Sequence, residues 1–171
     1  FRAMNDVDMP VERVLRGIEA AVQAGLTPIK INAVIKRGVN DHDLVGFIRQ
    51  FRGSGHIVRF IEYMDVGHTN GWRMNEVVSA TEILETIAAG EGLEPIAPDY
   101  RGEVARRWRL DGGGEIGVIA SVTQPFCGDC TRARLSADGK LFTCLFATGG
   151  FDLRRALRDG STDEELEQLI G

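Results

Sequence analysis

The three cysteines of the chain are the residues whose type and spacing best suit chemistry. They are Cys127, Cys130 and Cys144, in the pattern C-x2-C-x13-C within FCGDCTRARLSADGKLFTCLF. Two cysteines three positions apart can bind one metal ion, because a tight turn brings their sulfur atoms together. Gly128 lies between them and suits such a turn. The pair therefore predicts a metal site.

The third cysteine is distant in sequence, but a hairpin would bring it back. Asp138-Gly139 is a typical hairpin turn. The strand after this turn would run alongside residues 131–135. We therefore expect Cys144 to return to the neighbourhood of Cys130.

Three interpretations of the cysteines remain open at this point. A structural zinc site requires four ligands, so His56 or His68 would have to complete it. A disulfide would use the C-x-x-C pair and leave Cys144 idle. An iron–sulfur cluster held by three thiolates would leave one iron open to a ligand that is not protein. The spacing alone favours zinc over an iron–sulfur cluster, and a cluster over a disulfide.

Two arginines follow the second cysteine directly. Arg132 and Arg134 alternate along a predicted strand, so both guanidinium groups are expected on one face beside the metal. Guanidinium groups bind phosphate oxygens in a bidentate manner. The pair therefore indicates phosphate binding, with a solvated arginine pair as the alternative.

The elements that must position these residues begin with an alternation of helices and strands. Asp8 and Pro10 are expected to open a helix that reaches about residue 24. Ser79 and Glu82 form a capping box. The order of elements is typical of a parallel α/β layer, either a doubly wound sheet or part of a barrel. The predicted order is helix 8–24, strand 29–35, helix 43–52, strand 56–64 and helix 79–89.

Basic side chains occur in both predicted strands. Lys30 shares a face with Asn32, and Arg59 lies in IVRFIEYM. We expect both strands to be interior, where an unpaired charge is costly, so an anionic ligand at the mouth of the sheet would explain the two charges. Met64 ends the second strand. It suits core packing, but its position beside the irregular segment 65–78 makes it a candidate ligand contact.

The character of the chain changes near residues 90–98. Two antiparallel hairpins and two short helices are predicted beyond this point, at residues 153–158 and 162–170. We therefore predict two parts, 1–94 and 95–171. A hydrophobic content of 43% and a net charge of −5 are typical of a soluble globular protein and argue against general nucleic-acid binding. No apolar run is long enough to span a membrane, and we expect a cytoplasmic location.

Three motifs resemble a known family. IKINAVIKRGVND, VRFIEYMDVGHTNGW and PFCGDCTRARLSADGKLFTCLF look like the second half of the GTP 3′,8-cyclases of molybdenum cofactor biosynthesis, which are radical S-adenosylmethionine (SAM) enzymes. The resemblance extends from end to end. It implies a fragment of an incomplete parallel β/α (TIM-like) barrel, followed by a small mixed α+β part that carries an iron–sulfur site.

The resemblance also assigns roles to residues. Cys127, Cys130 and Cys144 would hold a [4Fe–4S] cluster whose open iron binds the guanine of GTP. Met64 would contact SAM. The residues that would contact GTP are Lys30, Arg59, Arg132, Ala133 and Arg134. The product would be 3′,8-cyclo-7,8-dihydro-GTP, which a cyclic pyranopterin monophosphate synthase consumes.

The sequence departs from the family pattern in one important respect. The C-x3-C-x2-C motif of the SAM cluster is absent, as is the first half of the barrel. We therefore expect a piece of a longer protein, inactive alone, whose full-length form carries a second [4Fe–4S] cluster and SAM. Exposed strand edges would permit a homodimer. The alternatives are a non-catalytic zinc module and another radical-SAM enzyme with an auxiliary cluster.

Overall fold

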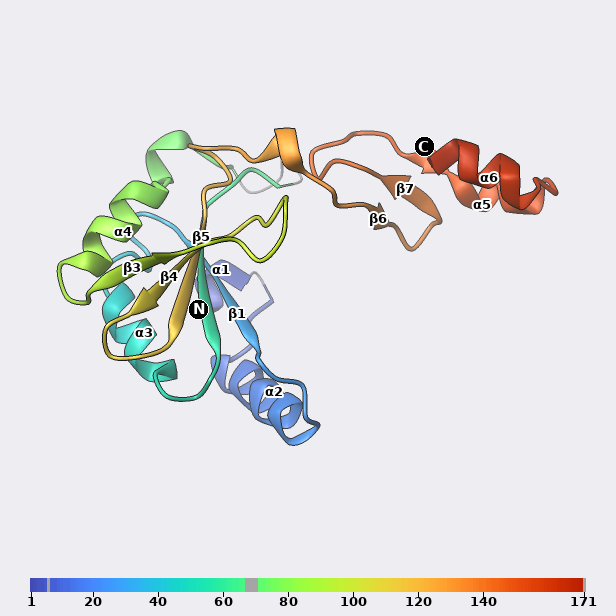
Figure 1. Cartoon of the computed structure of the whole chain (residues 1–171). Coiled ribbons are helices and arrows are strands. Elements are labelled where there is room, and N and C mark those ends of the chain that lie inside the picture. The colour runs from blue at the N-terminus through green and yellow to red at the C-terminus, as the bar shows by residue number, and fades with distance from the viewer. Residues whose placement is uncertain (6, 67–70, 171) are drawn as a thin grey trace. The chain divides into compact units, whose positions relative to one another are not determined.

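A computed structural model describes residues 1–5, 7–66 and 71–170 of the chain. The chain divides into two compact units, drawn in Figure 1. We call the first, residues 1–64 and 73–125, the sheet unit, and the second, residues 65–72 and 126–171, the cysteine unit.

The sheet unit contains a five-stranded mixed sheet with the order β1-β2-β5-β4-β3. Its strands are β1 Lys30–Ile35, β2 Ile57–Glu62, β3 Leu93–Ile96, β4 Arg106–Leu110 and β5 Glu115–Ile119. The first three strands in this order run parallel, while β4 and β3 are antiparallel to their neighbours. The prediction of an α/β fold is therefore confirmed, in the form of a mixed sheet.

Two helices cover one face of this sheet and form the core with it. They are α3 Leu44–Phe51 and α4 Ala80–Ala88. Alternation along the strands directs one set of side chains to these helices. The buried core is Ile35, Leu44, Ile48, Val58, Phe60, Val78, Ala80, Ile83, Ile87, Trp108, Leu110, Ile116, Val118 and Ala120.

Local capping signals fix most of the helix starts. Asp43 accepts the Gly46 N–H at 2.8 Å, and Ser79 with Glu82 forms the predicted capping box of α4. The prediction for Asp8 is wrong, because α2 is Val11–Gln23 and its N-cap is Pro10, without a side-chain cap. The remaining short elements of this unit are α1 Arg2–Asn5 and the 3₁₀ turn η1 Met74–Glu76.

The cysteine unit has a small three-stranded sheet followed by two helices. Its elements are η2 Cys127–Asp129, β6 Arg134–Leu135, β7 Lys140–Phe142, β8 Phe151–Asp152, α5 Leu153–Arg158 and α6 Asp163–Ile170. β6 and β7 form the predicted Asp138-Gly139 hairpin. Thr162 and Glu165 cap α6, because each side chain accepts the other residue's N–H. Among its described residues, Leu141 alone is in the buried class.

The predicted boundary between residues 94 and 95 falls inside β3. The β4–β5 hairpin therefore belongs to the sheet unit, because β5 pairs in parallel with β2. Within the described ranges, no helix is long and apolar enough to cross a membrane.

Candidate functional site

The face of the sheet opposite α3 and α4 carries polar side chains. Strand register places Asn32, Arg59, Gly117 and Arg107 in one row across four strands. Arg107 is neutralised there, because it donates to both carboxylate oxygens of Glu115, at 2.6 and 3.0 Å. These ion pairs raise the pKa of Arg107 above its ordinary value, first through Glu115 and then through Asp99.

Arg59 differs from Arg107 in having no acidic partner among the described residues. Its Nε is buried and has no hydrogen-bond partner among the described residues. Gly117 leaves space for the side chain, since an added Cβ would lie 3.1 Å from Cγ of Arg59. A buried donor without a partner is costly. Arg59 therefore stays a candidate for binding an anion.

Lys30 lies on the same face as Arg59, but the prediction that its strand is interior is wrong. It is exposed and begins β1, which is an edge strand of the described sheet. Its register partner is Ile57, the first residue of β2, so Lys30 lies at the amino ends of the parallel strands and not at their mouth. Met64 lies at the carboxyl end, two positions after β2 ends, and is half-buried.

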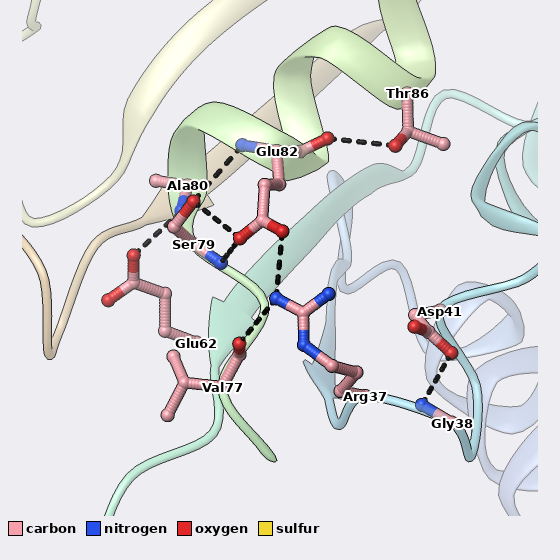
Figure 2. A network of polar contacts seen from close by, with 9 residues as sticks. All are labelled: Arg37, Gly38, Asp41, Glu62, Val77, Ser79, Ala80, Glu82 and Thr86. Atoms are coloured by element: carbon pink, nitrogen blue, oxygen red, sulfur yellow. Dashed lines mark hydrogen bonds and ion pairs between the residues drawn. The ribbon is translucent and has the colours of Figure 1, made fainter. Parts of the chain in front are cut away.

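A buried glutamate at this carboxyl end was missed by the sequence interpretation. Glu62 Oε1 accepts the Ala80 N–H at 2.7 Å and the Thr123 hydroxyl at 2.5 Å. Its Oε2 accepts the backbone N–H groups of Val122 and Thr123 at 2.7 and 2.8 Å. Figure 2 shows the carboxylate directed at the start of α4. Alternation with the buried Val58 would have placed Glu62 on the core face.

The first two cysteines lie on the predicted tight turn. The Cys130 N–H donates to the Cys127 carbonyl at 3.4 Å, across η2. Both thiols are free and exposed, as is that of Cys144. The backbone N–H of Arg132, followed by its guanidinium, lowers the pKa of the Cys130 thiol. A lowered pKa favours the thiolate, which is the form that binds metals.

The structure does not gather the three thiols. Among the described residues, no three histidine, cysteine or acidic side chains lie close enough to hold a metal ion. The β6–β7 ladder explains this, because its last pair is Arg134 with Phe142 and Cys144 lies beyond it. Three free thiols in one unit are the type of ligand that iron–sulfur clusters use, although these three do not lie close together. His68 lies outside the described residues.

The two arginines do not alternate along one strand, contrary to the prediction. Arg134 begins β6, but Arg132 precedes it in irregular backbone. Arg132 instead donates to the Cys130 sulfur at 3.4 Å, and its guanidinium lies 4.8 Å from the Phe126 ring centroid. Ala133 between them is exposed. The Arg132 side chain is therefore already beside a thiol.

Comparison with known proteins shows the family of the chain. Three curated relatives are named GTP 3′,8-cyclase: one from Acidothermus cellulolyticus is 54% identical over 99% of this chain, one from Xanthomonas campestris is 50% identical over 94%, and one from Staphylococcus saprophyticus is 44% identical over 97%. The matches cover 47%, 48% and 49% of these relatives, so the chain spans about half their length. Residues 56–171 match the family described as Molybdenum Cofactor Synthesis C. The chain belongs to this family.

Proposed function

We propose that this chain is the C-terminal part of a GTP 3′,8-cyclase and carries part of its GTP site. The observation that supports this most directly is 44–54% identity to proteins of that name over nearly the whole chain. The five-stranded sheet is then a fragment of an incomplete β/α barrel. Its parallel strands β1, β2 and β5 suit a barrel wall, with α3 and α4 outside and the polar face inside.

Cys127, Cys130 and Cys144 would hold a [4Fe–4S] cluster, which supplies an open iron for a ligand that is not protein. The composition of the cysteine unit supports a bound group of this kind. Leu141 alone is in the buried class among the unit's described residues, while Leu135 and Leu157 are 68% and 61% exposed. A unit with so little apolar core gains stability from a metal site.

The basic residues would hold the nucleotide. Among the residues that the structure describes, the buried Nε of Arg59 has no hydrogen-bond partner, and Arg134 begins β6 close in sequence to the cysteines. Lys30, Arg132 and Ala133 complete the proposed GTP contacts. Their role is to bind and orient the phosphates so that ribose C3′ and guanine C8, the atoms to be joined, are fixed for reaction.

Met64 would contact SAM from the end of β2. SAM, the second [4Fe–4S] cluster and catalysis require the other half of the full-length protein, so this chain alone would be inactive. The product would pass to a cyclic pyranopterin monophosphate synthase. A homodimer is also proposed, since β1 leaves an edge in the described sheet.

Anaerobic reconstitution of the chain with iron and sulfide tests the proposal. We expect a brown protein with about four irons, which Cys144→Ser loses. Thr143→Ala alters the adjacent exposed position without removing a thiol and should retain the iron. A colourless protein with one tightly bound zinc would reject the cyclase proposal and favour a zinc module.

Nucleotide binding in the full-length protein tests the arginine assignments separately. Arg134→Ala and Arg132→Ala should weaken GTP binding while iron content stays intact. Arg158→Ala removes an exposed arginine of the same unit, on α5, and should change neither. Unchanged GTP affinity in both motif variants would reject their role.

A further inference from the structure

Glu62 is a buried acidic side chain to which the proposed chemistry gives no role. Its side chain is 0% exposed, at the last position of β2. A buried carboxylate is costly unless hydrogen bonds satisfy it, and it is usually paired with a cation. Glu62 instead receives three backbone N–H groups and one hydroxyl from the described residues.

The carboxylate joins three segments that are distant in sequence. Glu62 itself ends β2, just before Met64. Ala80 is the first residue of α4, where helix N–H groups and the helix dipole favour an anion. Val122 and Thr123 follow β5 and belong to no helix or strand. Glu62 thus fixes the end of one parallel strand to the segment that leaves its neighbour.

The third of these segments depends on Glu62 for its hydrogen bonds. Both consecutive N–H groups of Val122 and Thr123 donate to Oε2, and the Ser121 hydroxyl donates to the Glu62 main-chain oxygen at 3.1 Å. The Ser121 N–H also donates to the Ile119 carbonyl at 3.1 Å, a bond between residues two positions apart. The chain then continues to Cys127, four residues after Thr123.

We propose that Glu62 is a positioning residue for the first two thiols. Its carboxylate fixes residues 121–123 and so sets the point from which the chain leaves the sheet unit for Cys127. The consequence for metal binding rests on the proposed function, whereas the fixing of residues 121–123 does not.

The donors explain why the side chain is a carboxylate and not an amide. All the groups that contact it can donate, and only the Thr123 hydroxyl can turn to accept. A glutamine would therefore direct its NH₂ group at one or more backbone N–H groups. Glu62→Gln keeps the size of the side chain but leaves such a donor unsatisfied, so it tests the carboxylate itself.

Hydrogen exchange and iron retention in the 171-residue chain test the proposal. In Glu62→Gln, the amides of Val122 and Thr123 should exchange about 10- to 100-fold faster, the change expected when one buried donor loses its acceptor. The reconstituted cluster should be lost to a chelator about tenfold faster, because the cysteine turn is less constrained. Glu62→Asp retains the charge on a shorter side chain and should fall between Glu62→Gln and the wild type.

Glu85→Gln is the matched control, since it alters an exposed glutamate on α4 that has no contact with residues 121–123 among the described residues. It should leave both measurements at wild-type values. Unchanged exchange in Glu62→Gln, or equally fast iron loss in Glu85→Gln, would overturn the proposal. If the wild type took up no iron, the proposed function would fail, and exchange alone would decide the role of Glu62.

Discussion

Acid should weaken the start of α4 through Glu82. Its Oε2 accepts the N–H and the hydroxyl of Ser79 at 2.9 and 2.8 Å, and its Oε1 accepts from Arg37 at 2.7 Å (Figure 2). The Ser79 N–H, then Arg37, then the Ser79 hydroxyl lower the pKa of Glu82 to about 2. Arg37 also donates to the Val77 carbonyl at 2.9 Å, which fixes its position.

The size of the effect follows from this pKa. A decrease from 4.5 to about 2 corresponds to about 3.4 kcal/mol of differential stabilisation. The Glu82 and Arg37 side chains are both 45% exposed, so solvent screening reduces the expected contribution to about 1–1.5 kcal/mol. Because the carboxylate pKa is lower in the folded state, this stability is present above pH 4.5 and is lost as the pH falls toward 2.

Urea unfolding of the wild type and Glu82→Gln, followed by circular dichroism, measures this contribution. At neutral pH the variant should be less stable by about 1–1.5 kcal/mol. The difference should shrink steadily between pH 4.5 and pH 3, because Glu82 takes up a proton in the unfolded chain while it stays ionised in the folded one. Glu85→Gln alters an exposed glutamate on the same helix and should show a smaller difference. A Glu82 difference that stays constant over this range would refute the charge-based explanation.

Two further predictions concern the core and the thiols. Ile83→Ala should lower the free energy of unfolding by about 2–5 kcal/mol, because Ile83 of α4 is 0% exposed in the core against the sheet. A loss well under that range in urea titrations would contradict this packing. In the metal-free chain, Cys130 should react with iodoacetamide at neutral pH faster than Cys127, and Arg132→Gln should slow the reaction of Cys130. Mass spectrometry of the labelled peptides measures the two rates. Equal rates for the two cysteines would count against the contact between Arg132 and the Cys130 sulfur.

The sequence by itself determined the local elements of this protein. The capping box at Ser79 identified the start of α4, because a cap is made by residues three positions apart. The Asp138-Gly139 turn identified a hairpin for the same reason. Motifs also pointed to the family that the comparisons show. The Asp8 cap failed, since Pro10 occupies that place without a side-chain bond.

The tertiary structure decided which distant segments meet. β5 pairs with β2 although almost sixty residues separate Val58 from Ile116, so the hairpin that seemed to open a second part completes the first sheet. That pairing also brings Thr123 to Glu62. No local pattern could predict this contact, because it depends on strand order. Residue types and short spacings fix the local elements, whereas the cost of burying a charge is met only by partners that the whole fold assembles.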